Sequence, residues 1–186
     1  MMDRGDRRGE GARPARVPRR ITPDYLQRAA MYYLERYSVP AAQLRRVLTR
    51  KIALSCRHHG DDPASHAQAL DAVVARCVAS GLVDDRRFAE ARAATLRRKG
   101  QSQRAVAARL SAKGVSRELV GEVTAGEASD ELAAARIAAK RRRLGPWRAA
   151  EKRAESRQKD LAALARLGFA YATARAVIDG EAEPSL

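Results

Sequence analysis

Signals that begin and end helices recur at short intervals along this chain, and they constrain its fold more than any other feature. Thr22, Asp84, Ser102 and Ser116 each precede an amphipathic segment as N-capping residues, and a further segment is expected to begin at Ser38. Gly100 and Gly114 end two of these segments. Residues that favour strands are scarce, because the chain has 39 Ala but only 21 Ile, Val and Thr together. These features exclude an extensive sheet and predict an all-α fold.

The apolar residues of these segments have the spacing of one helical face. Leu70, Val73, Val74, Cys77 and Val78 form an i, i+3, i+4, i+7, i+8 stripe. Three helices of this kind make one unit, and diverged copies of the unit follow one another, so we predict about nine helices in an elongated array of three tandem three-helix repeats. The expected parts are a disordered basic tail at 1–20, repeats at 21–83, 84–126 and 127–180, and a C-terminal tail at 181–186.

The ends of the chain and its cysteines indicate where the protein works. Residues 1–20 are rich in Gly, Pro and Arg and cannot bury enough surface to offset the entropy of ordering. No segment approaches the roughly 20 apolar residues of a membrane-spanning helix, and no apolar segment of a signal peptide follows the N-terminal arginines. Cys56 and Cys77 are too few and too far apart for a disulfide scaffold. We therefore expect a soluble, cytoplasmic protein without membrane contact.

The sequence lacks the patterns that mark common catalytic sites. It has no Gly-x-x-x-x-Gly-Lys-Ser/Thr loop for nucleotide phosphates. Cys56, His58, His59 and His66 do not have the spacing of metal ligands. Cys56 and His59 lie one helical turn apart, but nothing supplies an oxyanion hole or a third, orienting group. We expect no catalytic residue, no metal and no cofactor, and thus no enzyme.

Basic residues gather in two places. Residues 84–126 hold 10 basic and 5 acidic side chains, and residues 136–166 hold 11 basic and 3 acidic ones. Like charges at i, i+4 destabilise a helix unless an anion docks, so this pattern predicts binding to a polyphosphate backbone. The alternative is a solvated helix face on which arginines near helix C-termini complement the helix dipole. The candidate binding residues are Arg97, Arg98, Lys99, Arg104, Arg109, Arg136, Lys140, Arg143, Arg148 and Lys152.

Residues 104–120 look like a DNA-reading helix-turn-helix, but their turn has the wrong length. Three residues separate Leu110 from Gly114, where the usual sharp turn places Gly directly after the Leu that ends the first helix. We therefore do not expect sequence-specific DNA recognition. Trp147 stacks on a base, anchors a partner or packs between helices, and packing is the favoured alternative.

Four motifs follow one another in a characteristic order along residues 24–179. They are Gly81-Leu82-Val83-Asp84-Asp85-x-x-Phe88-Ala89, Arg97-Arg98-Lys99-Gly100, Leu110-x-x-Lys113-Gly114-Val115 with Leu119, and Leu164-x-x-Leu167-Gly168-Phe169. In this order and spacing, the chain resembles the RecX family of recombinase regulators. It departs from the family by an extra stretch at about 53–62 and by an Arg-rich third repeat.

The resemblance implies a curved array of repeats that binds the RecA recombinase in its filament on single-stranded DNA. Such a protein lies in the filament groove and restrains filament growth, ATPase, strand exchange and co-protease activity, and so acts as a negative regulator of homologous recombination and the SOS response. We expect phosphate contacts that do not depend on DNA sequence, and a monomer. The alternative is a stand-alone, non-specific DNA- or RNA-binding helical protein.

Overall fold

In the computed structural model, which describes residues 17–125 and 128–181, the chain folds into nine α-helices, with no strand within those ranges. The predicted all-α fold is therefore confirmed. Short 3₁₀ turns follow α2 and α7 and precede α8. The helices are α1 (Pro23–Leu34), α2 (Ala41–His59), α3 (Ala67–Ala79), α4 (Asp85–Arg98), α5 (Gln103–Lys113), α6 (Arg117–Thr124), α7 (Ala128–Arg142), α8 (Arg153–Arg166) and α9 (Tyr171–Ile178).

Side-chain caps begin four of these helices where the sequence predicts them. Thr22, Asp84, Ser102 and Ser116 each accept a hydrogen bond from the backbone N–H three residues further on. The start of α2 differs from the prediction, which placed it at Ser38. Because the residue before a proline is biased away from helical backbone angles, the helix begins only after Pro40.

The buried apolar side chains form three cores, each built by three consecutive helices. The first group (α1–α3) encloses Leu26, Leu44 and Leu48, which are fully buried. The second group (α4–α6) is centred on Val106 and Leu110, and the third group (α7–α9) combines Leu164 with buried alanines of α7. The repeat boundaries 21–83, 84–126 and 127–180 stay our proposal, and each core lies within one of these ranges.

Val83 and Phe88, on either side of the start of α4, pack against different cores. Val83 is buried in the first core, whereas Phe88 is half-buried against the second core. The segment between α3 and α4 therefore passes from one core to the next.

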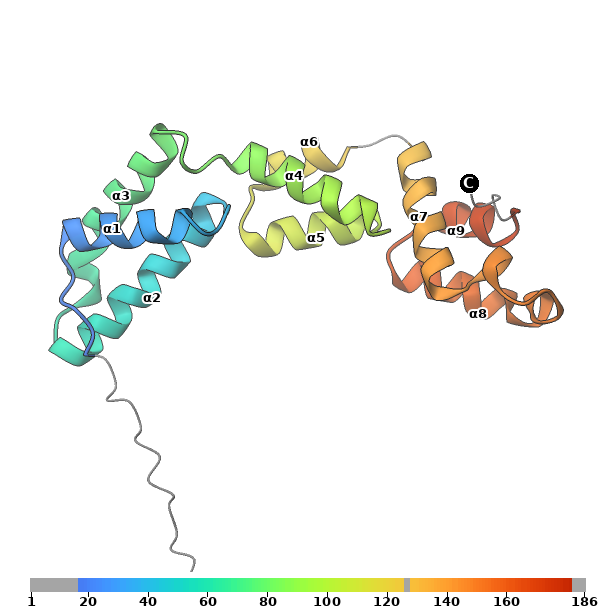
Figure 1. The fold of residues 1–186 in the computed structure, drawn as a ribbon, viewed down its shortest axis with the longest axis horizontal. Coiled ribbons are helices and arrows are strands. Elements are labelled where there is room, and N and C mark those ends of the chain that lie inside the picture. The colour runs from blue at the N-terminus through green and yellow to red at the C-terminus, as the bar shows by residue number, and fades with distance from the viewer. Residues whose placement is uncertain (1–16, 126–127, 182–186) are drawn as a thin grey trace, which may run out of the picture.

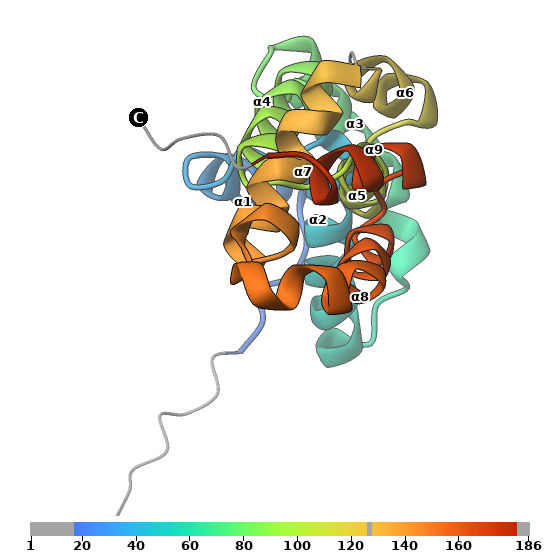
Figure 2. The same ribbon diagram turned by 90° about the vertical axis from the view of Figure 1, so that its right-hand side faces the viewer.

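The three groups follow one another along the long axis of the molecule (Figure 1). The middle group occupies only the upper part of this view, so the molecule has a bowed outline. Seen along the long axis, the groups lie one behind another (Figure 2). Each group therefore meets only its neighbours in the chain, as in other repeat proteins.

The two joints between groups share one design, in which an acidic side chain near the start of one group's first helix caps the second helix of the preceding group. At the first joint, the Ala41 N–H donates to Asp85 Oδ1 at 2.8 Å. At the second joint, the Gln103 N–H donates to Glu131 Oε2 at 2.9 Å. Since the first N–H groups of a helix have no partner inside it, each carboxylate satisfies a donor that would otherwise be left open.

The C-terminus of α5 also approaches the first group, and the C-terminus of α8 approaches the second group in the same way. At the first joint, Arg46 of α2 donates to the carbonyl of Lys113 at 2.5 Å. At the second joint, Ser102 Oγ donates to the carbonyl of Leu167 at 2.7 Å. Both carbonyls lie at helix C-termini, where acceptors lack a partner within the helix.

The extra stretch of the first repeat continues α2 as far as His59, so that α2 is longer than α5 by more than two turns. Its last turns contact the end of the expected N-terminal tail. Ser55 Oγ donates to the carbonyl of Arg19 at 2.8 Å, and His59 Nε2 lies 2.8 Å from the carbonyl oxygen of Pro18. Residues 1–16 of that tail, and residues 182–186 of the C-terminal tail, lie outside the described residues.

Four further properties concern the alternatives considered above. None of the helices in the described ranges is both long and apolar enough to span a bilayer. In the same ranges, no group of three or more His, Cys, Asp or Glu gathers to hold a metal ion. Burial raises the pKa of the thiols of Cys56 and Cys77, so neither is activated as a nucleophile. Trp147 is half-buried against the third core, as the packing alternative predicts.

Candidate functional site

The ten basic candidates lie on the second and third groups of helices, and eight of them fall into two kinds. Some hold the fold together through a carboxylate. Others point into solvent, and within residues 17–125 and 128–181 these form no ion pair. The exposed, unpaired candidates are Arg98, Lys99, Arg104, Arg109, Arg143 and Lys152.

Arg97 belongs to the second joint. Its guanidinium lies 2.6 Å from Glu131 Oε2, and the side chains of Arg97 and Glu131 are only 20% and 16% exposed. The same carboxylate caps α5, so Arg97 and the Gln103 N–H share one acceptor. Arg97 therefore holds α4 against α7, and the Glu131 carboxylate already neutralises its charge.

Arg148 forms a similar ion pair with Asp160 of α8. Asp160 is almost fully buried and accepts two hydrogen bonds from Arg148, at 3.0 and 2.5 Å, and one from the Gly145 N–H at 2.8 Å. Burial alone would raise the pKa of Asp160, but the hydrogen bonds from Arg148 and Gly145 outweigh it and hold the pKa below its ordinary value. The carboxylate is ionised at neutral pH and orders the turn between α7 and α8.

The remaining two candidates lie on α7. Arg136 is half-buried and Lys140 is exposed, and both make a polar or electrostatic contact within the chain. The chain turns sharply just after α7, at Arg143, which has a left-handed backbone (φ 55°).

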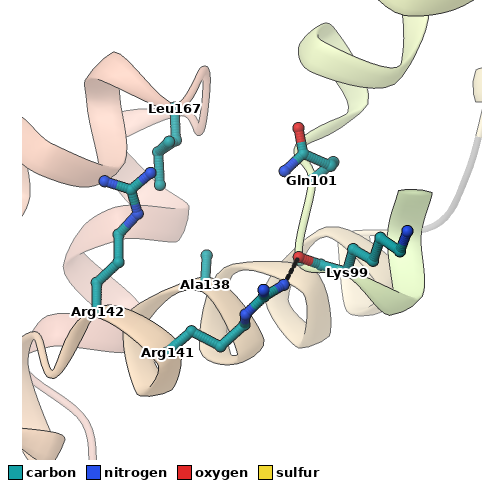
Figure 3. Close-up of a pocket in the computed structure, with 7 residues that line it drawn as sticks. Lys99, Gln101, Ala138, Arg141, Arg142 and Leu167 are labelled. Atoms are coloured by element: carbon teal, nitrogen blue, oxygen red, sulfur yellow. Dashed lines mark hydrogen bonds between the residues drawn. The ribbon is translucent and has the colours of Figure 1, made fainter. Parts of the chain in front are cut away.

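A pocket of about 350 Å³ opens at the second joint, between the α4–α5 turn and the third group. Its walls carry three cations and no carboxylate, and Lys99 is the member of the predicted set that lines it. Arg141 crosses the joint from α7 and donates to the carbonyl of Lys99 at 3.0 Å (Figure 3). The lining residues are Lys99, Gly100, Gln101, Ala138, Arg141, Arg142 and Leu167.

Sequence reasoning did not select three polar members of this pocket. Arg141 and Arg142 stand in the same basic run as Lys140 and Arg143, so the signal was present in the sequence. Gln101 carries no charge and stands in a turn, and no sequence pattern distinguishes it. Arg157 was also left out, and it is held by a pair of 2.7 Å hydrogen bonds to Asp179.

The array of three-helix groups and the positions of its motifs agree with comparisons to known proteins. A family model described as RecX, second three-helix domain, matches residues 84–123, which contain α4, α5 and most of α6. A "Regulatory protein RecX" of Myxococcus xanthus is 42% identical over 166 residues, which are 87% of this chain and 88% of the relative.

A second "Regulatory protein RecX", from Agrobacterium fabrum, is 30% identical over 147 residues, which are 79% of this chain and 78% of the relative. No solved structure matches the chain. Since the similarity to the Myxococcus protein extends over nearly the whole of both chains, this chain belongs to the RecX family of regulatory proteins.

Proposed function

We propose that this protein binds the filament that RecA recombinase forms on single-stranded DNA, and that it inhibits filament extension, ATPase, strand exchange and co-protease activity. It would thereby restrain homologous recombination and the SOS response. The observation that carries the proposal is the set of exposed cations without carboxylate partners along α4, α5 and the α7–α8 region, on an elongated scaffold.

The physical argument is electrostatic complementarity. A nucleoprotein filament presents phosphates and acidic protein surface along its length, and an elongated basic molecule follows such a surface over several subunits. The contacts are to phosphate and therefore independent of DNA sequence. In this proposal the protein acts as a cytoplasmic monomer that covers part of the filament surface and neutralises its charge. It therefore needs neither a catalytic residue nor a cofactor.

The test is the single-stranded-DNA-dependent ATPase rate of the cognate recombinase, titrated with the full chain at fixed moderate salt and with a polyanion competitor as control. We expect inhibition at protein levels well below one per recombinase subunit, and inhibition that survives excess free DNA. Inhibition that appears only when the protein saturates the DNA would instead identify a stand-alone nucleic-acid-binding protein.

Charge-reversal variants locate the surface. The triple variant Lys99→Glu, Arg104→Glu, Arg143→Glu changes exposed residues only and leaves Arg97 and Arg148 to hold the fold. We expect its half-inhibitory concentration to rise by about tenfold or more, because several charged contacts become repulsive.

The matched control reverses three exposed arginines of the first group, Arg50, Arg57 and Arg76, and changes the net charge by the same amount. We expect a change of about twofold or less, since a distant charge acts only through the screened overall field. Equal losses in the two variants would show that net charge, and not this surface, is responsible.

A further inference from the structure

Each of the two joints holds a pocket, and these two pockets differ in charge. The pocket at the first joint, of about 440 Å³, is lined by apolar residues together with Asp84 and Asp85. The pocket at the second joint carries Lys99, Arg141 and Arg142 and no carboxylate. An anion is therefore repelled by the pocket that Asp84 and Asp85 line and attracted by the pocket that Lys99, Arg141 and Arg142 line.

The donors of the second pocket face one another across the joint. In Figure 3, Arg142 and Leu167 stand on one side, Gln101 stands on the other, and Ala138 lies between them on α7. The guanidinium of Arg141 is already fixed by its hydrogen bond to the carbonyl of Lys99. A ligand in this space meets donors from both groups of helices at once.

Arg142 is the side chain best placed to bind such a ligand. It is exposed, and in the described part of the chain it has no acidic partner. Glu131, a carboxylate at the same joint that does not line the pocket, is already held by Arg97 and the Gln103 N–H. A guanidinium presents parallel N–H groups that match the oxygens of a phosphate, and an amide such as that of Gln101 adds a neutral donor.

We propose that the pocket at the second joint is a phosphate-binding site, in which Arg142 and Gln101 donate from opposite walls and Arg141 and Lys99 add positive charge. The ligand is a phosphate ester or anhydride, supplied either by a phosphodiester of single-stranded DNA or by a free pyrophosphate-containing molecule. The inference goes beyond the proposed function, because it assigns a ligand that binds without recombinase.

Binding at this place also stabilises the joint. The lining residues come from the α4–α5 turn on one side and from α7 and the end of α8 on the other. A ligand that contacts both sides binds only when the second and third groups are docked, so it favours the docked arrangement by mass action. We therefore expect phosphate ligands to raise the thermal midpoint of the full chain.

The test uses the full chain in phosphate-free buffer, with two probes. Fluorescence anisotropy of a short labelled oligothymidylate reports the strand source, and calorimetric titration with inorganic pyrophosphate reports the free source. For Arg142→Gln we expect the dissociation constant of the bound probe to rise by about tenfold, the loss of one charge-assisted hydrogen bond. In this variant, we expect that neither pyrophosphate nor oligothymidylate raises the thermal midpoint.

Arg117→Gln is the matched control, since Arg117 is an exposed arginine of α6 outside the pocket and its replacement removes the same charge. We expect it to change binding by about twofold or less. Gln101→Glu, which places a carboxylate in the pocket, is expected to weaken binding at least as much as Arg142→Gln. Helicity by circular dichroism verifies that each variant folds.

If Arg142→Gln weakens the binding of oligothymidylate and Arg117→Gln does not, the DNA strand is the source of the phosphate. If Arg142→Gln instead weakens the binding of pyrophosphate, the source is a free ligand. The proposal is overturned if Arg142→Gln and Arg117→Gln weaken both probes equally, or if neither probe binds. Because recombinase is absent from this test, its outcome is separate from that of the ATPase experiment.

Discussion

Asp160 orders the turn between α7 and α8 in the basic third group. It is buried, yet it stays charged because two N–H groups of Arg148 and the Gly145 N–H surround its carboxylate. Loss of Asp160 leaves the Gly145 N–H and the partly exposed Arg148 guanidinium without their acceptor, so it costs more free energy than the intact pair contributes.

Replacing Asp160 by Ala is therefore expected to lower the free energy of unfolding by about 3 kcal/mol. Chemical denaturation followed by circular dichroism measures the change. Asp71→Ala serves as control, because Asp71 pairs with Arg45 at the exposed surface, where an ion pair contributes little. Similar losses in the two variants would contradict the structural role of Asp160.

The lowered pKa of Asp160 also predicts a dependence of stability on pH. The folded state holds the proton less tightly than the unfolded state, so the stabilisation is fully present above the ordinary aspartate pKa of about 4. It is lost as the pH falls from that value through the lowered pKa of the folded state.

Thermal midpoints measured from neutral pH to about pH 3 are expected to fall more steeply in the native chain than in Asp160→Asn. The variant retains part of the slope, because hydrogen bonds from Arg157 also lower the pKa of Asp179. Parallel curves for the two proteins would assign the slope to other carboxylates.

At the scale of elements, a glycine that ends a helix has a role that depends on what lies opposite it. Gly60 ends α2 and Gly114 ends α5, and both have positive φ, +75° and +89°. A Cβ on Gly60 would meet no atom within 4 Å, whereas a Cβ on Gly114 would lie 2.5 Å from the Cβ of Ala42 in the preceding group. Gly114 therefore permits both a turn and the close approach at the first joint.

Alanine at these two positions separates the two roles. Gly60→Ala is expected to cost about 1 kcal/mol, the penalty of a left-handed backbone alone. Gly114→Ala adds a steric clash, for which a further 1–3 kcal/mol is typical, so its total is about 2–4 kcal/mol. The difference between their urea midpoints measures the contact at the joint, and equal midpoints would mean that the joint opens without cost.

At the scale of the whole molecule, stability is the sum of three small cores and two joints. The second joint depends on Glu131, whose carboxylate binds Arg97 and caps α5. Without it, the second and third groups keep their own cores but lose the charged contact between them.

Glu131→Gln is expected to lower the free energy of unfolding by about 2 kcal/mol and to broaden or split the calorimetric transition, because the groups then unfold less cooperatively. Differential scanning calorimetry of the full chain measures both effects. Glu118→Gln, an equivalent change at an exposed position of α6, is the control. A single, sharp transition at an unchanged midpoint in Glu131→Gln would contradict the role of this joint.

The sequence by itself determined the all-α class, the capped helix starts at Thr22, Asp84, Ser102 and Ser116, and the basic character of the second half. These properties depend on residues within a few positions of one another, so they can be recognised without a fold. The start of α2 lies a few residues after the predicted one, because Pro40 disfavours helical backbone angles at the residue before it.

Only the tertiary structure decided which cations are available to a ligand. Arg97 and Arg148 look like their neighbours in sequence, yet Glu131 and Asp160 neutralise them across a joint and a turn. Gln101 and Arg142 come together only because α7 packs against the α4–α5 turn. Helix signals are local, whereas ion pairs and pockets depend on distances between residues that are far apart in the chain, and those distances are fixed by packing.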